Sequence, residues 1–392
     1  MISTKVAHAM QRSSWIRKMF EEGARLRTQH GADAVHDFSL GNPVIEPPQA
    51  VLDALVRAAD PKVAGAHRYM PNAGYPEVRG AVASHLAQRT GLPFEGKHVI
   101  MSVGAGGGLN VVMKTILDPG DEVILLTPYF VEYDFYVDNH GGTPVHVPTD
   151  ERFQLDLGAI ERALTPRTRA ILLNSPNNPC GVVYPRESLD ALGTLLRDAS
   201  KRMGRTIAIV TDEPYRYISY GADVPWVFAS YENTILVTSH SKDLALPGER
   251  IGYIAFDPRV QSLEALIAGA TFCTRTLGFV NAPAIQQRAV GELQGVTVDP
   301  EIYRRKRDRF HAALVDAGYD VVFPEGAFYM FPKTPIADDV AFVRMLLEEL
   351  ILVVPGTGFG RPGHMRISYC VDDGTIERAL PGFARAIARA RA

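Results

Sequence analysis

Cysteine is scarce in this chain: 392 residues include only Cys180, Cys273 and Cys370, and no two of them form a CxxC pair. Cysteines so far apart indicate neither a disulfide framework nor a zinc site, and they are compatible with a reducing cytosol. No window reaches the roughly 18 apolar residues that a membrane span needs. Residues 1–20 also lack the continuous apolar stretch of a signal peptide. We therefore expect a cytoplasmic protein with no membrane partner and no metal.

An excess of one charge sign is also missing. The 41 Lys and Arg residues nearly balance 44 Asp and Glu residues, for a net charge of −3. This balance gives no reason to expect nucleic acid or an anionic membrane as a partner. An apolar content of 46% and a charged content of 22% are ordinary for a globular protein. The length suits one large α/β domain or two smaller domains.

Short β-branched runs alternate with helical patterns in the middle of the chain. Strands are predicted at 98–103, 122–126, 170–174, 206–211, 234–238 and 251–256. Amphipathic helices are predicted between several of them, at 109–117 and from 186 to about 201. This alternation predicts a mostly parallel sheet covered by helices on both faces.

The chain after about Asn281 has a different pattern. A helix at 300–317 leads into segments 320–323 and 327–331; a helix at 338–349, a strand at 365–369 and a last helix from Thr375 follow. This pattern predicts a smaller α+β domain. We expect residues 286–392 to form it, residues 1–45 to join it, and residues 46–285 to form the large domain.

Polar groups directly follow four of the predicted strands. They are Asn174-Ser-Pro-Asn-Asn-Pro-Cys-Gly181, Asp212-Glu-Pro-Tyr215, Ser239-His-Ser-Lys242 and Gly104-Ala-Gly-Gly-Gly108. Ligands of open α/β sheets gather beyond the carboxyl ends of the strands, so we expect these groups at one edge. The glycine run is no dinucleotide fingerprint, because Leu109 stands where G-x-G-x-x-G needs glycine. It is either a tight turn or a turn before a helix N-terminus that suits a phosphate.

Lys242 and Asp212 each have an ordinary interpretation and a chemical one. A lone lysine is most often a surface charge, but one that is partly desolvated near another cation, here Arg250, becomes a nucleophilic amine. Asp212 ends the apolar run Ile-Ala-Ile-Val-Thr, where an unpaired carboxylate would be costly. Its partner is either a basic side chain or a pyridinium nitrogen.

Over nearly its whole length the chain resembles the fold type I, class I/II pyridoxal-phosphate aminotransferases, the aspartate aminotransferase-like superfamily. The motifs that carry the resemblance are Leu40-Gly41-Asn-Pro43, Tyr69-x-x-x-x-Gly74, Asn177-Asn-Pro-Cys-Gly181, Asp212-Glu-Pro-Tyr215, Ser239-x-Ser-Lys242, Gly248-Glu-Arg-Ile-Gly252, Gly326-Ala-Phe-Tyr329 and Arg366-Ile-Ser368. Each motif alone is weak, but their order and spacing together are specific. The resemblance implies that the large domain binds pyridoxal 5'-phosphate (PLP) and has a sheet of the seven-stranded type.

The resemblance also implies a role for each motif residue. Lys242 would hold PLP as an aldimine and move a proton, Asp212 would keep the pyridine nitrogen protonated, and Tyr215 would bond the phenolic oxygen. These three are the predicted catalytic residues. The predicted cofactor-binding residues are Ala105, Gly106, Phe130, Asn178, Asp212, Tyr215, Ser239, Ser241, Lys242, Arg250 and Tyr69. The predicted substrate-binding residues are Gly41, Asn178 and Arg366.

Three of these residues would make a contact that depends on the type of side chain. Phe130 would stack on the pyridine ring, with Tyr133 a weaker candidate for that place. Arg366 would grip the substrate α-carboxylate with two hydrogen bonds, which lysine cannot do. Tyr69 would reach the cofactor phosphate of a neighbouring subunit, which implies a homodimer with shared sites.

The chain departs from many relatives at Ala105-Gly106, where they carry a polar pair such as Ser-Gln. Backbone contacts to a phosphate survive this change, whereas the side-chain contacts are lost. Some aspartate-using relatives carry lysine at the position of Gly106. Its absence argues against that mode of aspartate recognition, although Arg275 could substitute. Selectivity is expected to depend on residues near 16–20, Tyr69, 272–281 and Phe359.

Three functions share this pattern. The first is a transaminase that exchanges an L-amino acid with a 2-oxo acid by a ping-pong mechanism, with glutamate/2-oxoglutarate or alanine/pyruvate as one pair. The second is a β-eliminating carbon–sulfur lyase or a cyclising synthase, which would use the same lysine and aspartate. The third is the effector-sensing part of a transcription regulator, which needs a basic helix-turn-helix extension for which the segment before Leu40 leaves no room. We expect the first.

Overall fold

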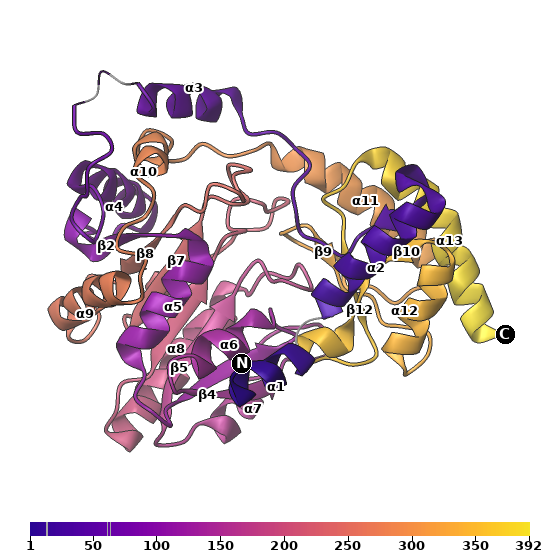
Figure 1. The fold of residues 1–392 in the computed structure, drawn as a ribbon. Coiled ribbons are helices and arrows are strands. Elements are labelled where there is room, and N and C mark those ends of the chain that lie inside the picture. Colours follow the sequence, from indigo (N-terminus) through magenta and orange to yellow (C-terminus); the bar gives the residue numbers. More distant parts are fainter. Residues whose placement is uncertain (13–14, 61, 63) are drawn as a thin grey trace.

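Seven strands form the large sheet around which most of the chain is arranged (Figure 1). They are β2 (Val99–Ser102), β3 (Glu122–Thr127), β4 (Thr143–Pro148), β5 (Thr168–Asn174), β6 (Ala208–Asp212), β7 (Thr234–Ser239) and β8 (Gly252–Phe256). Their order is β2-β8-β7-β6-β5-β3-β4, and every pair is parallel except those made by β8. This computed structural model describes residues 1–12, 15–60, 62 and 64–392. The predicted fold, mostly parallel α/β with a seven-stranded sheet, is confirmed.

All six strands predicted for this sheet are present, with ends within two residues of the prediction. The seventh, β4, was not predicted. Its sequence Thr-Pro-Val-His-Val-Pro contains two prolines, each of which removes a backbone donor from the sheet. β4 lies at the edge of the sheet and pairs only with β3, which is where a strand tolerates proline.

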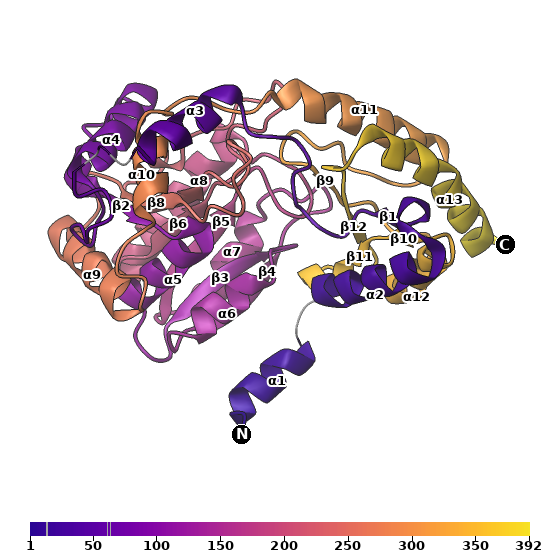
Figure 2. The same cartoon turned by 45° about the horizontal axis from the view of Figure 1, so that its top comes forward.

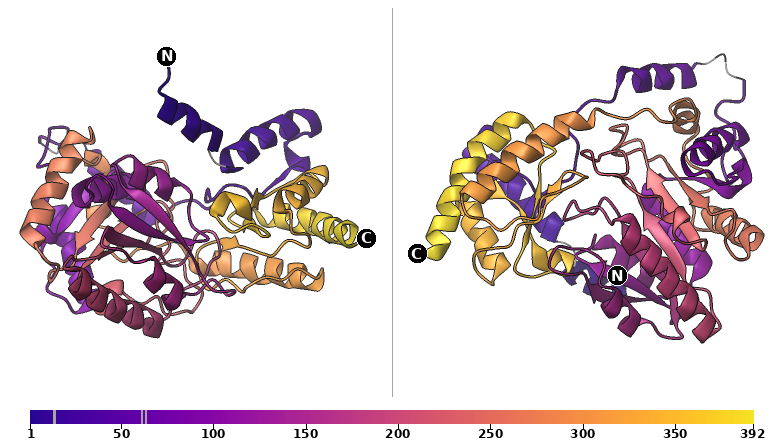
Figure 3. Two further views of the ribbon diagram at one scale, coloured as in Figure 1. Left: turned by 90° about the horizontal axis from the view of Figure 1, so that it is seen from below. Right: turned by 180° about the vertical axis from the view of Figure 1, so that it is seen from behind.

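Alternate residues of the central strands point to opposite faces of the sheet, and both faces are buried. In β5, Ile171 and Leu173 pack in the same core as helix α8 (Arg186–Met203), while Ala170 and Leu172 pack with helix α5 (Gly104–Ile116). Helices therefore cover both faces, as the sequence predicts (Figure 3). The other helices of this part are α3 (Gln49–Ala58), α4 (Pro76–Thr90), α6 (Glu132–Asp138), α7 (Leu157–Ala163), α9 (Leu263–Thr276) and α10 (Ala284–Gly291).

The first and last parts of the chain lie together. Strand β1 (His36–Asp37) pairs in parallel with β10 (Ile351–Leu352). An antiparallel sheet of order β11-β12-β9 lies beside them, formed by β9 (Tyr329–Met330), β11 (Val354–Pro355) and β12 (Met365–Ser368). The accompanying helices are α2 (Trp15–His30), α11 (Pro300–Asp316), α12 (Asp339–Glu348) and α13 (Asp373–Arg391). Sheet pairing thus joins residues more than 300 positions apart.

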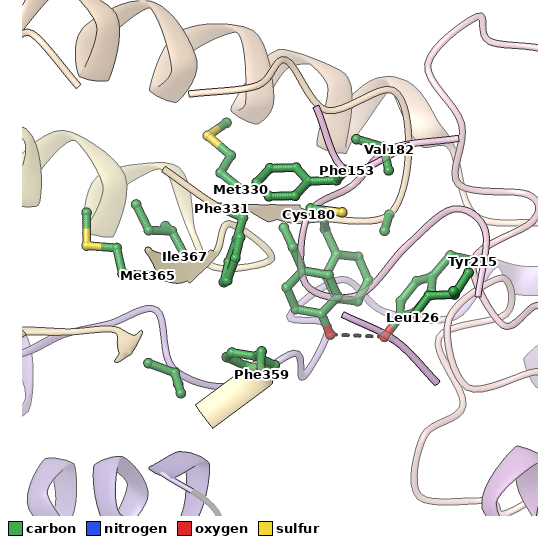
Figure 4. Packing of buried hydrophobic residues seen from close by; sticks show 14 of the residues in the cluster. Leu126, Phe153, Cys180, Val182, Tyr215, Met330, Phe331, Phe359, Met365 and Ile367 are labelled. Atoms are coloured by element: carbon green, nitrogen blue, oxygen red, sulfur yellow. Dashed lines mark hydrogen bonds between the residues drawn. The ribbon is translucent and has the colours of Figure 1, made fainter. Parts of the chain in front are cut away.

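The two sheets share a hydrophobic core. Figure 4 shows Cys180, from a loop of the large sheet, near Met330 of the small sheet and near Phe331, which follows it; Tyr215 belongs to the same core. Helix α1 (Thr4–Arg12), by contrast, projects from the rest of the molecule (Figure 2), with Lys5 Nζ 2.9 Å from a carboxylate oxygen of Asp138. No helix among the described residues is long and apolar enough to cross a membrane.

Candidate active site

A cavity of about 320 Å³ opens at the carboxyl ends of the parallel strands, between the two sheets. Its walls come from the loops after β2, β3, β5, β6 and β7, together with residues of the N- and C-terminal parts. The lining residues are Gly41, Ala105, Gly106, Leu109, Phe130, Tyr133, Tyr136, Asn174, Asn178, Asp212, Pro214, Tyr215, Ser239, Ser241, Lys242, Pro247, Arg250, Tyr329 and Arg366. Every predicted site residue except Tyr69 lies in this wall.

Lys242 directs its amine into the cavity and is no surface charge. Its Nζ donates a hydrogen bond to the carbonyl oxygen of Gly41 at 2.7 Å. The pKa of Lys242 is lowered to about 8, chiefly by burial and also by the nearby guanidinium groups of Arg250 and Arg366, against the opposing effect of Cys370. The neutral amine, which a nucleophile and proton acceptor requires, is therefore far more populated near physiological pH than in an ordinary lysine.

Asp212 ends β6 with one carboxylate oxygen bonded and one free. Tyr133 Oη donates to Oδ2 at 2.7 Å, while Oδ1 is buried with no hydrogen-bond partner. The residue is only 7% exposed, and burial raises the pKa of its carboxyl group to about 7 against the opposing effect of the Tyr133 hydrogen bond. No described Lys, Arg or His forms an ion pair with it. Of the two partners that the sequence allows for Asp212, a basic side chain is therefore not found among the described residues.

Arg366, on β12, lines the same cavity. It is 2% exposed and donates to Ser39 O at 2.5 Å and to Asn178 Oδ1 at 3.1 Å. The rings of Tyr329 and Phe359 lie 4.8 and 4.7 Å from its Cζ atom, and its Nε has no partner. Burial lowers its pKa. Two hydrogen bonds and two aromatic rings thus hold the group, and no carboxylate among the residues that the structure describes forms an ion pair with it.

Asn178 and Tyr215 lie between the lysine and the arginine sides of the cavity. The backbone N–H of Asn178 donates to Asn174 Oδ1 at 2.7 Å, so one asparagine orients the other. The hydroxyl oxygens of Tyr215 and Tyr329 are 3.0 Å apart, a contact drawn as a dashed line in Figure 4. Burial raises the pKa of Tyr215, so its phenol stays neutral and can donate a hydrogen bond.

The glycine run corrects one detail of the sequence prediction. Helix α5 starts at Gly104, so Ala105 and Gly106 form its first turn and do not precede it. Gly104 has a φ of +66°, and a Cβ atom there would lie 2.7 Å from Nη2 of Arg250. The arginine therefore packs directly over the helix N-terminus. Ser239 and Ser241, whose hydroxyls are 3.1 Å apart, line the same cavity.

The structure also gives the surroundings of two further aromatic candidates, Tyr133 and Tyr69. Tyr133 was the weaker candidate for stacking, but its hydroxyl bonds Asp212 and its ring packs at 86° against Phe130. Tyr69 is 90% exposed and lines a separate surface hollow with residues that include Phe279 and Asn281. The side chains of Ile16, Arg17 and Phe20, in the predicted selectivity segment 16–20, lie outside those the structure describes.

The sequence left six wall residues without a role: Leu109, Tyr136, Asn174, Pro214, Pro247 and Tyr329. Asn174 and Tyr329 belong to segments that were already singled out, because one ends a predicted strand and the other ends the Gly326–Tyr329 motif. Tyr136 carries no such signal. It lies on α6, a seven-residue helix whose orientation is fixed by packing, and its hydroxyl is 3.0 Å from the place of a Cβ atom on Gly106.

The wall fits PLP group by group. A helix N-terminus with free N–H groups, two serines and an arginine suits a phosphate. A buried carboxylate with an unpaired oxygen suits a protonated ring nitrogen, because such an oxygen otherwise costs free energy. Lys242 supplies the amine that a cofactor aldehyde requires. The fold and this donor set together define the broad class: a PLP-dependent enzyme.

Comparisons with known proteins agree. The family model "Aminotransferase class I and II" matches residues 34–383. The aspartate/prephenate aminotransferase of Thermus thermophilus is 37% identical, over 93% of this chain and 94% of that protein. The aspartate aminotransferase of Geobacillus stearothermophilus is 32% identical over 88% and 90%.

Solved structures give the same result. An aminotransferase from Eubacterium rectale superposes with a TM-score of 0.96 at 38% identity, covering 100% of both chains. The aspartate aminotransferase of Thermus thermophilus with maleate gives 0.86 at 34% identity, over 95% and 97% of the two chains. The chain belongs to the class I and II aminotransferases. It is therefore a PLP-dependent enzyme that transfers amino groups.

Proposed function

We propose that this enzyme exchanges the amino group of an L-amino acid with a 2-oxo acid, using Lys242 as both the attachment point of the cofactor and the proton carrier. The observation that supports this most directly is the lowered pKa of Lys242 inside a cavity that also holds Asp212 and Arg366. When bound, PLP supplies an aldehyde for amino groups and an electron-withdrawing ring. The released Lys242 Nζ then takes the proton from the substrate Cα and returns it.

The other wall residues orient the two molecules. Arg366 binds the substrate α-carboxylate, because its guanidinium is buried and has an unpaired Nε, and Asn178 and the backbone of Gly41 assist. The Asp212 carboxylate holds the ring N–H, and Tyr215 and Asn178 donate to the phenolic oxygen. Phe130 covers the ring. The backbone at Ala105 and Gly106, the hydroxyls of Ser239 and Ser241, and the Arg250 guanidinium bind the phosphate.

The chain is divided into a large PLP-binding domain (46–285) and a small one (286–392) that includes residues 1–45, and two copies form a homodimer. The β1–β10 pairing supports the inclusion of the N-terminal segment. The exposure of Tyr69, outside its own cavity, supports its contribution to the neighbouring subunit's phosphate site. Exposed apolar side chains at Val56 and Phe272 are also consistent with a covered surface.

A half-reaction experiment tests the proposal. Holoenzyme is mixed with single amino acids: aspartate, because similar enzymes are aspartate aminotransferases, and glutamate and alanine. Transamination converts the bound cofactor to its pyridoxamine form and leaves a 2-oxo acid, and 2-oxoglutarate or pyruvate reverses this. An S-alkylcysteine, which carries a thiolate leaving group on Cβ, is tested alongside; loss of the thiol with release of pyruvate and ammonia and recovery of the original spectrum indicates β-elimination and contradicts the proposal. Lys242→Ala should abolish both the starting absorbance and the conversion.

A further inference from the structure

Tyr133 lines the cavity and bonds the carboxylate of Asp212. It is the second residue of α6, its side chain is 2% exposed, and its hydroxyl lies 2.7 Å from Asp212 Oδ2. Burial and the neighbouring Asp212 charge raise the pKa of Tyr133. Its phenol therefore keeps its proton, so the hydrogen bond runs from tyrosine to carboxylate in one direction only.

The rest of the Asp212 surroundings is arranged asymmetrically. Asn174 Nδ2 donates to the backbone carbonyl of Asp212 at 2.8 Å, not to its carboxylate. The neighbouring carboxylate of Glu213 is bonded by Arg216 at 2.5 Å and by the Thr211 hydroxyl at 2.8 Å. Within the described chain, Tyr133 is therefore the one side chain that bonds the Asp212 carboxylate, and Oδ1 is left without a donor.

We infer that Tyr133 is a positioning residue for the cofactor: by occupying Oδ2 of Asp212, it leaves Oδ1 as the single oxygen presented to the pyridine nitrogen. This inference rests on the proposed role of Asp212. It replaces the stacking role that the sequence suggested for Tyr133.

The same short segment also positions the stacking residue. Phe130 and Tyr133 are three residues apart, with ring centroids 5.6 Å apart and planes at 86°, an edge-to-face contact. The segment therefore fixes the ring that covers the pyridine and the carboxylate that bonds its nitrogen relative to each other. A displacement of α6 would disturb both contacts together.

The chemical consequence concerns the proton shared by the pyridine nitrogen and Asp212. A hydrogen bond to a carboxylate stabilises its charged form by roughly 1.5–3 kcal/mol, which corresponds to roughly a tenfold to hundredfold change in proton affinity. Without the Tyr133 hydroxyl, Asp212 becomes the stronger base and draws the proton away from the ring. The ring then withdraws electrons less well, which slows the reaction.

The experiment compares Tyr133→Phe with wild-type enzyme and with Tyr136→Phe. Tyr136 is the matched control: it lies on the same helix and lines the same cavity, and its hydroxyl faces Gly106. Each protein is loaded with PLP labelled with ¹⁵N in the ring, and the nitrogen chemical shift gives the protonated fraction against pH. In cofactor-free samples, infrared spectroscopy follows the titration of the Asp212 carboxyl group, with Asp212→Asn identifying its band.

In Tyr133→Phe we expect the ¹⁵N signal to move toward the value of an unprotonated ring. In the cofactor-free protein we expect the midpoint pH of the Asp212 titration to rise, which corresponds to a roughly tenfold or greater increase in the proton affinity of the carboxylate. Tyr136→Phe should show neither effect. Unchanged values in Tyr133→Phe, or equal changes in both variants, would overturn the inference. If Tyr133→Phe does not fold, 3-fluorotyrosine at position 133, a stronger donor, should move both readouts the opposite way. Failure to bind PLP would refute the proposed function alone, because the infrared titration needs no cofactor.

Discussion

The buried Asp212 carboxylate should make the cofactor-free protein less stable as pH rises, and Asp212→Asn should remove that loss. The pKa of Asp212 is about 7 in the folded chain, against an ordinary value of 3.8. Below pH 3.8 the group is neutral in both the folded and unfolded states, so its burial costs little. Between pH 3.8 and about 7 the unfolded chain releases the proton and the folded chain keeps it, so stability falls with rising pH.

The size of this effect follows from the two pKa values. At 1.36 kcal/mol per unit, the step from 3.8 to about 7 amounts to about 4 kcal/mol. A chain of 392 residues unfolds with an entropy of about 0.8 kcal/mol/K, taking about 2.1 cal/mol/K per residue. The melting temperature of Asp212→Asn should therefore rise relative to wild type by about 5 °C between pH 4 and pH 8.

The assay is thermal unfolding of both cofactor-free proteins in matched buffers across this pH range. Asparagine has nearly the shape of aspartate and can still accept the Tyr133 hydrogen bond, so the comparison isolates the charge. With PLP bound, the order should reverse, because only the carboxylate pairs with a protonated ring nitrogen. A melting difference that does not depend on pH, or wild type gaining stability over the variant as pH rises, would refute the reasoning.

Two further predictions concern the substrate and the second subunit. Arg366→Lys should lower kcat/KM for the amino donor by about 10–100-fold, because lysine cannot make the two parallel bonds to a carboxylate. The Kd for the cofactor should change little. Steady-state kinetics and cofactor titration measure the two quantities, and an equal loss of kcat/KM and of cofactor affinity would reject the assignment. Tyr69→Ala should weaken PLP binding although Tyr69 lies outside its own cavity. Mixing Tyr69→Ala with Lys242→Ala should restore activity in hybrid dimers, because one of the two shared sites is then intact. If subunit exchange is confirmed and activity still does not recover, site sharing is contradicted.

Much of this site could be predicted because its residues follow strands. Asp212 ends β6, and Asn178 and Lys242 come shortly after the ends of β5 and β7. Parallel neighbours carry such residues to one edge whatever the details of packing. Arg366 was harder, because it lies on a different sheet. Its place was implied by motif order alone, and the structure brings it to within 3.1 Å of Asn178, 188 positions away.

The features that were missed depend on packing that no local pattern encodes. Strand β4 carries prolines and mixed burial, so only its pairing with β3 makes it a strand. The start of α5 at Gly104 depends on the +66° φ angle that lets the chain turn beneath Arg250. The Tyr133–Asp212 bond depends on the angle at which a seven-residue helix meets a strand 79 residues away. A rotation of α6 by one residue would point Tyr133 elsewhere with no change in sequence pattern.

The cavity holds ionisable groups whose environment works against their charged forms. Burial raises the pKa of Asp212 to about 7, lowers that of Lys242 to about 8, and lowers that of Arg366. Core packing alone would favour neutral residues at all three positions, since an unpaired buried charge is costly. Each of these groups is suited instead to a charged or electrophilic part of a bound molecule: the ring N–H, the aldehyde and the α-carboxylate. These groups therefore destabilise the empty protein but favour the binding of cofactor and substrate, which supply their missing partners. For this reason Asp212→Asn should stabilise the cofactor-free protein and impair the enzyme.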